Sequence, residues 1–297
     1  MREVLVCPIC GAKTFTPFLN CKDYAVSQET FQLVQCAQCQ FVATSPAPHN
    51  NDIAKYYLSD TYISHSNKAK TLLDKFYLLA RTFTLKWKLK LISNNLNKTT
   101  DVTLLDYGCG TGEFLKKCKS RGWKICGIEP SDIARIQSSE ATKALIAPSL
   151  ADISFNKFDI ITLWHVLEHI PDLDDTLEKL KSRLSDSGTM FIAVPNHKSW
   201  DATYYKAYWA GYDLPRHLWH FSQQNMETLL QKNRLKLIRR MPMKLDALYV
   251  SLLSEKYRNN GKSTIASTIH ALFNGFKSNL RARISNEYSS LIYIVRK

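Results

Sequence analysis

The chain has 297 residues, 45% of them hydrophobic and 22% charged, a composition typical of a globular protein of about two domains. No apolar run approaches the roughly 20 residues of a membrane-spanning helix, and the first residues lack the layout of a signal peptide, so we expect a cytoplasmic protein. The formal charge of +14 suggests an anionic partner. Because Lys and Arg are spread along the chain, an anionic small molecule or lipid headgroup is favoured over nucleic acid.

Residues 1–48 contain two C-x-x-C pairs, formed by Cys7, Cys10, Cys36 and Cys39. Four thiolates at this spacing can surround one Zn²⁺, whereas disulfides are disfavoured in a chain without a signal peptide. So short a segment builds little core, so we expect a zinc ribbon with a structural metal. A ribbon binds nucleic acid or supports a neighbouring domain, and the scarcity of basic residues between the pairs favours support. The other four cysteines are interpreted as small apolar residues.

Residues 49–100 predict a helical linker or cap between the ribbon and the rest of the chain. A tyrosine-rich stretch at 56–65 is either an aromatic packing surface or a flap over a ligand pocket. From 68 to 96 the apolar residues recur at helical spacing, which predicts one long amphipathic helix.

The most specific motif follows the apolar run 102–105, which ends in Asp106. Three glycines then alternate with other residues before a helical pattern begins; they are Gly108, Gly110 and Gly112. Glycine permits positive φ and lets a ligand lie against the backbone at a helix N-terminus. A second apolar strand, 124–128, ends in Glu129, where doubly wound folds hold a ribose diol. The pattern predicts a nucleotide-type site in which Asp106 suits an ammonium group.

Together these residues resemble the class I S-adenosylmethionine-dependent methyltransferases, and the resemblance extends from 102 to 196. It implies a Rossmann-like α/β fold with a seven-stranded sheet. It also implies that Asp106 and the three glycines surround the methionine part of the cofactor and that Glu129 binds the ribose hydroxyls. Asp152 is similar in position to the family's acidic residue near adenine, the alternative being a surface carboxylate. A Rossmann-like domain for another nucleotide is the alternative to the family as a whole.

The fourth predicted strand, 158–163, leads into Trp164 and a histidine-rich stretch. These residues follow the carboxyl end of the strand, where open α/β sheets bind their ligands. This stretch resembles ubiquinone-pathway O-methyltransferases and many small-molecule and sugar methyltransferases, and we expect Trp164 beside the cofactor. His165, Glu168 and His169 share one face at i, i+3 and i+4. Three interpretations are open: His169 is a general base, the trio binds a metal, or Glu168 and His169 form a structural hydrogen-bonded pair. In some relatives an acidic residue, followed three residues later by Glu-His, binds a divalent metal. In this chain His165 occupies the position of that acid, so the match is incomplete.

An aromatic-rich segment, 197–221, follows the fifth predicted strand and is either a lid over a substrate or a buried cap. Within it, Arg216 is a candidate for pairing with an anionic substrate group, and His217 or His220 is a candidate base. Residues 246–284 predict basic amphipathic helices that contact a membrane surface or a partner, or form a solvated face. A final strand fits the family's antiparallel seventh strand.

These features predict a ribbon at 1–48, a linker at 49–100 and a methyltransferase core at 101–297. The expected activity is S-adenosylmethionine-dependent methylation of a small molecule, such as a sugar, a lipid-linked compound or a secondary metabolite, at O or C. The ribbon-plus-core arrangement resembles bacterial enzymes that include zinc-containing sugar C-methyltransferases. The alternatives are an RNA methyltransferase and a non-catalytic adaptor that retains the cofactor fold.

Overall fold

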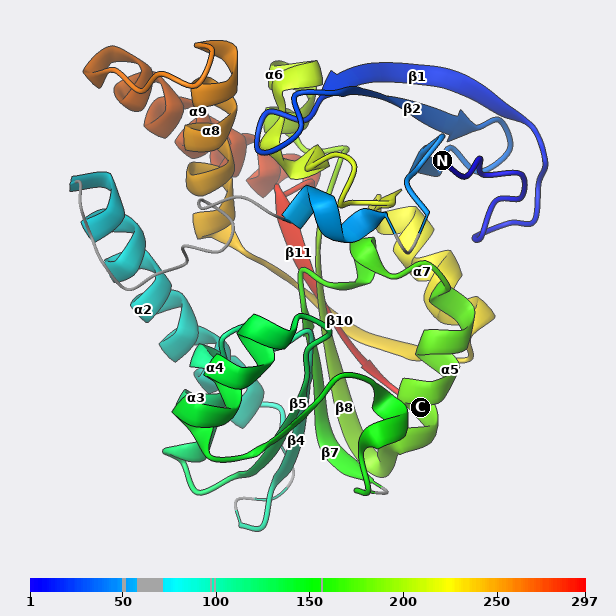
Figure 1. Ribbon diagram of the computed structural model, residues 1–297, viewed down its shortest axis with the longest axis vertical. Helices are drawn as coiled ribbons and strands as arrows, with labels where there is room; N and C mark the ends of the chain where they lie inside the picture. Colours follow the sequence, from blue (N-terminus) through cyan, green and yellow to red (C-terminus); the bar gives the residue numbers. More distant parts are fainter. Residues whose placement is uncertain (50–51, 58–71, 97, 99, 156) are drawn as a thin grey trace.

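The computed structural model describes residues 1–49, 52–57, 72–96, 98, 100–155 and 157–297. Two sheets organise these residues: a four-stranded sheet near the N-terminus and a seven-stranded sheet that forms the core (Figure 1). The predicted α/β methyltransferase fold with an N-terminal four-cysteine sheet is confirmed. Within the described residues, no helix has both the length and the apolarity to cross a bilayer.

The core sheet has the order β10-β11-β8-β7-β4-β5-β6. Its strands are β4 (Thr103–Tyr107), β5 (Lys124–Ile128), β6 (Leu145–Ala147), β7 (Phe158–Trp164), β8 (Leu184–Pro195), β10 (Lys236–Pro242) and β11 (Ser290–Arg296). The five strands from β6 to β8 pair in parallel, and β11 pairs antiparallel with both β8 and β10. Strands covered on both faces read as nearly continuous apolar runs, which is why the sequence revealed them.

Helices cover both faces of this sheet (Figure 1). One face is covered by α2 (Leu72–Ser93), α3 (Glu113–Lys119) and α4 (Asp132–Thr142), and the other by α5 (Leu173–Arg183) and α7 (Gln223–Lys232). Two separate clusters of buried side chains mark the two faces. Ile92 and Leu115 belong to the first, and Leu177 and Leu229 to the second. As predicted, residues 72–93 form a long helix, α2. The side chain of Ser131 caps the N-terminus of α4.

The N-terminal sheet has the order β1-β2-β3-β9. It contains β1 (Phe15–Lys22), β2 (Thr30–Cys36) and β3 (Val42–Thr44), and its fourth strand is β9 (Trp219–His220) from the aromatic-rich segment. Val42 pairs with His220 and Ala43 with Trp219. The ribbon and the segment at 197–221 are therefore one hydrogen-bonded unit, which lies across the carboxyl ends of the core strands (Figure 1).

The aromatic segment begins with α6 (Trp200–Tyr205) and is largely buried. Tyr205, Trp209 and Tyr212 form one apolar cluster with Phe31 and Leu33 of β2. This packing favours the buried cap over the solvent-exposed lid. In the tyrosine-rich stretch at 56–65, only Tyr56 and Tyr57 lie within the described residues, in the short 3-10 helix η1 (Ile53–Tyr57). The flap hypothesis concerns residues mostly outside the described part of the chain.

Near the C-terminus, α8 (Lys244–Arg258) and α9 (Ile265–Ser285) connect β10 to β11. They lie where the sequence predicts basic amphipathic helices, and residues 259–264 separate them. In Figure 1 this antiparallel pair lies at the upper left of the molecule, above the sheet whose strands β10 and β11 it connects.

Candidate functional site

The glycine turn after β4 lies directly against the stretch that follows β7. Gly108 has a φ of 73°, and a Cβ built on it would lie 2.5 Å from Val166 Cγ2. By contrast, a Cβ on Gly110 would meet no atom within 4 Å, so the backbone faces open space there. A side chain at Gly108 is excluded by the fold, whereas the space beside Gly110 is available to a ligand.

Asp106 is a buried carboxyl group at the end of β4. The Thr162 hydroxyl donates a hydrogen bond of 2.6 Å to Asp106 Oδ1. Burial raises the pKa of Asp106 to about 7, and the hydrogen bond from Thr162 and the charge of Lys88 only partly oppose this. A cationic ligand group beside Asp106 would favour its ionised form.

Lys88, from the last part of α2, also reaches this region. Its Nζ lies 4.2 Å from the centroid of the Trp164 ring, and burial lowers the pKa of Lys88 to about 8. Trp164 packs edge-on against Phe114 of α3, and its buried Nε1 has no hydrogen-bond partner in the part of the chain that the structure describes. These contacts place Trp164 against α2 and α3, and its expected position beside the cofactor stays a prediction.

Glu129, at the tip of β5, is anchored to the glycine turn. Its Oε2 accepts a hydrogen bond of 2.9 Å from Gly110 N, and its Oε1 accepts one of 2.9 Å from Ser131 N. A carboxylate has about four lone-pair sites, so two remain for other donors. Asp152 lies in the 3-10 helix η2 (Leu150–Asp152) after β6, is exposed, and accepts a hydrogen bond from Ser149 Oγ.

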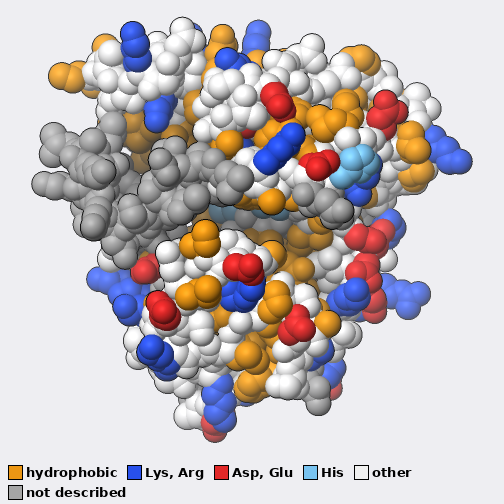
Figure 2. Space-filling model, in the orientation of Figure 1, with side chains coloured by type: hydrophobic (Ala, Val, Ile, Leu, Met, Phe, Trp, Pro, Cys, Tyr) orange, Lys and Arg blue, Asp and Glu red, His pale blue; other side chains and the backbone are white. Residues whose placement is uncertain are grey.

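These residues fit S-adenosylmethionine. The buried carboxyl group of Asp106, the open backbone at Gly110 and the Glu129 carboxylate, with its unused lone pairs, all lie at the glycine turn. Figure 2 shows the surface hollowed in this region, between the N-terminal sheet with its cap above and the core below, with hydrophobic side chains along the hollow.

The stretch after β7 does not form the regular helical turn expected from its spacing. His165 has a φ of 56°, and a 3-10 helix, η3 (Leu167–His169), follows. His165 Nε2 lies 2.9 Å from Asp246 Oδ2 of α8, and its Nδ1 lies 3.4 Å from Glu168 Oε1. Burial opposes a charged ring, but the bonds to Asp246 and Glu168 outweigh it and raise the pKa of His165 to about 9.

Glu168, His169 and His217 converge beneath the cap. One possible ligand atom from each lies within 4.8 Å of the others. Glu168 is fully buried; its Oε1 faces His165 Nδ1 at 3.4 Å and His217 Nε2 at 3.9 Å, and its Oε2 has no hydrogen-bond partner among the described residues. Burial alone would raise the pKa of Glu168; the neighbouring His165, followed by His217, holds it below the ordinary value. Glu168 is therefore an ionised carboxylate with unused acceptor capacity.

The two histidines are oriented by backbone carbonyls. His169 Nδ1 lies 3.0 Å from Arg216 O, and His217 Nδ1 lies 3.0 Å from Gly211 O. A carbonyl can only accept, so Nδ1 carries the proton in both rings, and in the neutral ring Nε2 has the free lone pair. Burial, together with His169, lowers the pKa of His217 to about 4, so this ring is neutral at neutral pH.

The structure thus redistributes the residues expected to act together. His217 joins Glu168 and His169, and His165 lies between Glu168 and Asp246. The hydrogen bond between Glu168 and His169 that a structural pair requires does not occur within the described part of the chain. His220 lies in β9, where its Nε2 is 3.0 Å from Thr44 Oγ1.

Arg216 is a structural residue rather than one exposed to substrate. Its guanidinium is buried, where its Nη2 contacts Asp23 Oδ1 at 3.0 Å and Asp213 Oδ1 at 2.7 Å. It also donates a hydrogen bond to Tyr56 O. The expectation that Arg216 pairs with an anionic substrate group is wrong for this conformation, because its charge is already neutralised between the ribbon and the cap.

Sequence reasoning missed three residues near the site. Asp246 and Lys88 lie on helices far from the motif in sequence, and Tyr57 Oη lies 3.1 Å from His169 Nδ1. None had a local signal, since a charged or aromatic residue on an amphipathic segment is ordinary. Only the tertiary packing of α2, η1 and α8 brings them to the carboxyl edge of the sheet.

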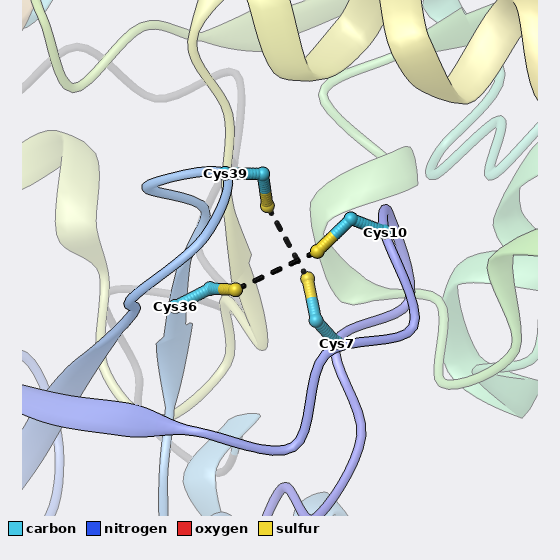
Figure 3. Close-up of side chains that lie close together, drawn as sticks. All are labelled: Cys7, Cys10, Cys36 and Cys39. Carbon is cyan, nitrogen blue, oxygen red and sulfur yellow. Dashed lines mark hydrogen bonds between the residues drawn. The ribbon is translucent and has the colours of Figure 1, made fainter.

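The four paired cysteines converge at the end of the N-terminal sheet (Figure 3). Cys7 Sγ lies 3.5 Å from Cys39 Sγ, and Cys10 Sγ lies 3.6 Å from Cys36 Sγ. Zn–S bonds of about 2.3 Å in a tetrahedron place sulfurs about 3.8 Å apart, close to these values. All four are free thiols, so the cluster is consistent with a zinc ribbon. The remaining four cysteines are buried, as predicted.

Comparison with known proteins agrees with this geometry. The family model described as "Methyltransferase domain" matches residues 72–239. The ubiquinone biosynthesis O-methyltransferase of Histophilus somni is 27% identical over 128 residues, covering 38% of this chain and 54% of that protein. That of a Chelativorans species is 34% identical over 102 residues, covering 31% of this chain and 40% of that protein. The chain thus spans about half the length of these curated relatives.

Among solved structures, magnesium protoporphyrin IX methyltransferase from Synechocystis, with bound S-adenosylhomocysteine, superimposes with a TM-score of 0.55 at 14% identity. The match covers 84% of this chain and 100% of that one, and at such identity it shows the fold alone. The family match is the stronger finding, since it takes in more than half of the chain. The protein therefore belongs to the methyltransferase domain family, as a class I, S-adenosylmethionine-type domain distantly related to ubiquinone O-methyltransferases.

Proposed function

We propose that this protein is an S-adenosylmethionine-dependent methyltransferase that acts on a small molecule. The observation that supports it most is the anchoring of Glu129 to Gly110 N, which joins the tips of β4 and β5 into one cradle. Asp106 at the base of the cradle would bind the cofactor's ammonium group, and Glu129 would bind the ribose hydroxyls. Asp152 would lie near the adenine amino group.

In this proposal the cofactor supplies a methyl group that its own sulfonium activates. The protein's part is to position the acceptor, and positioning accounts for much of the rate in such transfers. Trp164 would border the methyl group, and Glu168, His169 and His217 would face the acceptor. The last three residues lie on η3 and in the cap, beyond the carboxyl end of β7, where open α/β sheets bind their ligands.

Two roles are open to Glu168, His169 and His217. A neutral histidine with a free Nε2 can accept the proton of a hydroxyl or carbon acid, and His217 meets this condition. Alternatively, the three residues can hold a divalent cation, which would lower the pKa of a bound hydroxyl. The fully buried Glu168 carboxylate, whose Oε2 has no hydrogen-bond partner among the described residues, favours the cation role. Calorimetric titration with Mn²⁺ separates the two: binding that Glu168→Gln abolishes supports the cation, and its absence supports the base.

We also propose that Cys7, Cys10, Cys36 and Cys39 bind a structural zinc ion. The sulfur separations and the two backbone turns that hold them support this role. Gly11 N donates to Cys7 O, and Gln40 N donates to Cys36 O, so each pair sits on a tight turn of its own. In this proposal the zinc ion stabilises the ribbon and takes no part in methyl transfer.

A small-molecule acceptor, methylated at O or C, is preferred over RNA. The curated relatives are named for ubiquinone biosynthesis, and the ribbon between its cysteine pairs carries only two lysines. An RNA enzyme would instead be expected to carry a basic surface on its ribbon.

Calorimetric titration with S-adenosylhomocysteine, on protein checked for absence of nucleic acid by its absorbance ratio, tests the proposal. We expect micromolar binding by the wild type and a loss of at least about tenfold for Glu129→Gln, which removes the charge that orients the ribose. Absence of binding by the folded wild type would favour the adaptor alternative. RNA that stays bound through high salt would favour the RNA methyltransferase.

A further inference from the structure

Helix α9 presents its large apolar side chains to the outside of the molecule. The outward residues are between 36% and 89% exposed: Ile265, Ile269, Leu272, Phe273, Phe276, Leu280 and Ile284. The residues buried against the protein are small or polar: Ser267, Ala271, Asn274, Gly275, Ser278 and Ala282. This is the reverse of the usual arrangement, in which a surface helix turns its apolar stripe inward.

The inward face is fixed by close and specific contacts. A Cβ on Gly275 would lie 2.8 Å from Ala247 O and from Leu248 Cα of α8, so only glycine allows this approach. Ser278 donates a hydrogen bond of 2.7 Å to the buried Asp201, and Asn274 donates one to Tyr205 Oη. Rotating the helix to bury its apolar side would break these contacts, so the apolar stripe is held outward.

Seven large apolar side chains along one helix of 21 residues form a contiguous surface about 30 Å long. Monomeric proteins rarely leave such a surface uncovered unless it binds something. Charge indicates the kind of partner, because the charged residues of α9 are all basic.

Helix α9 contains three basic residues, Lys277, Arg281 and Arg283, and no acidic residue. Over both helices of the insertion, residues 244–285, Lys and Arg number seven and acidic residues two. Both acids are already paired: Asp246 with His165, and Glu255 with His270. The stripe is therefore surrounded by unbalanced positive charge.

We infer that α9 binds the surface of an anionic lipid bilayer, with its apolar stripe among the acyl chains and its basic residues at the headgroups. A helix with one apolar face and a basic border lies in the plane of the membrane interface. A second copy of the chain is a poorer partner, because it would bring the same positive charge to the contact. The α8–α9 pair lies at the outside of the molecule (Figure 1), and the stripe residues are exposed.

Vesicle flotation of the full-length protein tests this inference. We expect binding to vesicles of phosphatidylcholine mixed with phosphatidylglycerol, little binding to phosphatidylcholine alone, and weakening as salt is added. Replacing two stripe residues, Ile269→Ser with Phe276→Ser, is expected to reduce partitioning by more than about tenfold. Arg281→Gln and Arg283→Gln are each expected to reduce it about fivefold.

The matched control is Ile136→Ser on α4, which replaces an equally exposed isoleucine outside the insertion. It should bind vesicles as the wild type does. Because Ile269 and Phe276 are exposed, their replacement should leave the circular dichroism spectrum and thermal midpoint unchanged, which excludes unfolding as the cause.

Two results would overturn the inference. The first is equal vesicle binding by the wild type and the stripe variant. The second is that the wild type does not bind anionic vesicles at low salt and forms a dimer, detected by light scattering, whereas the stripe variant stays a monomer. The second result would assign the surface to another copy of the chain. Neither depends on methyl transfer, so the test is independent of the proposed activity.

Discussion

His165 Nε2 lies 2.9 Å from Asp246 Oδ2, which joins the carboxyl end of β7 to the first turn of α8. The pair is partly buried, with side-chain exposures of 32% and 20%, so the attraction is only partly screened by water. It fixes the base of the helical insertion to the residues around the candidate acceptor site.

The contribution of this pair is measurable by a double-mutant cycle. His165→Gln and Asp246→Asn are each expected to lower the free energy of unfolding, with a coupling of about 1 kcal/mol between them. Urea denaturation of the wild type, the two single variants and the double variant gives this coupling. A coupling near zero would mean that the two side chains do not interact in solution.

Binding of S-adenosylhomocysteine should depend on pH through Asp106. The carboxyl group of the free protein, with its pKa of about 7, takes up a proton as the pH falls through that value. The ligand's ammonium group favours the carboxylate, so binding must release that proton, and affinity should fall up to about tenfold per pH unit below 7. Calorimetry between pH 5 and pH 8 measures this trend. The Asp106→Asn variant should bind S-adenosylhomocysteine more weakly, and its affinity should not show this dependence on pH.

The same group affects the stability of the ligand-free protein with a defined sign. Between the ordinary carboxyl value of 3.8 and about 7, the folded state binds more protons at Asp106 than the unfolded state does. The contribution of this residue to stability therefore decreases as the pH rises through that window, and Asp106→Asn should remove this decrease.

Glu168→Gln should separate cofactor binding from methyl transfer. The change keeps the size of the side chain and removes the charge that faces His169 and His217, so we expect transfer to fall at least about 100-fold. Affinity for S-adenosylhomocysteine should be unchanged, because the cradle at Asp106 and Glu129 is untouched. The control is Glu178→Gln, an exposed glutamate on α5. Equal activity of the two variants would show that Glu168 takes no part in methyl transfer.

Disrupting the proposed zinc site in the ribbon should affect the candidate acceptor site but not the candidate cofactor site. Cys36→Ser removes one ligand and weakens the turn that leads into β3, which pairs with β9. The residue before β9, Leu218, donates its N–H to Glu168 O at 2.8 Å. Hydrogen exchange at residues 217–220 should therefore accelerate, while affinity for S-adenosylhomocysteine is retained. Equal loss of both would show that the ribbon also supports the core.

Gly108→Ala should destabilise the glycine turn through a clash with a named neighbour. The new Cβ would lie 2.5 Å from Val166 Cγ2 at a φ of 73°, and we expect a loss of about 2 kcal/mol in the free energy of unfolding. Gly122→Ala is the matched control, since its φ of 79° is similar but its surroundings are open. Val166→Ala should partly restore the Gly108→Ala variant. Equal effects of the two alanines would assign the whole cost to backbone conformation.

The features that the sequence predicted well depend on local pattern. The glycine turn, the acid at the tip of β5 and the cysteine pairs are short motifs whose chemistry requires fixed spacing. Apolar runs revealed the core strands for a similar reason. Residues joined by tertiary packing were not predictable in this way. His217 lies 48 positions beyond His169, and Asp246, which pairs with His165, lies 81 positions beyond it.

The strand β9 completes the ribbon sheet from a segment some 175 positions further along the chain than its partner β3. Neither part is a transplantable module as a result. A fragment ending near residue 48 would expose the unpaired edge of β3, and an exposed strand edge promotes aggregation by pairing with other chains. A fragment starting near residue 100 would leave β9 without its neighbour. Because this pairing closes so large a loop, it is expected to form late in folding, after the core sheet has brought the two segments together.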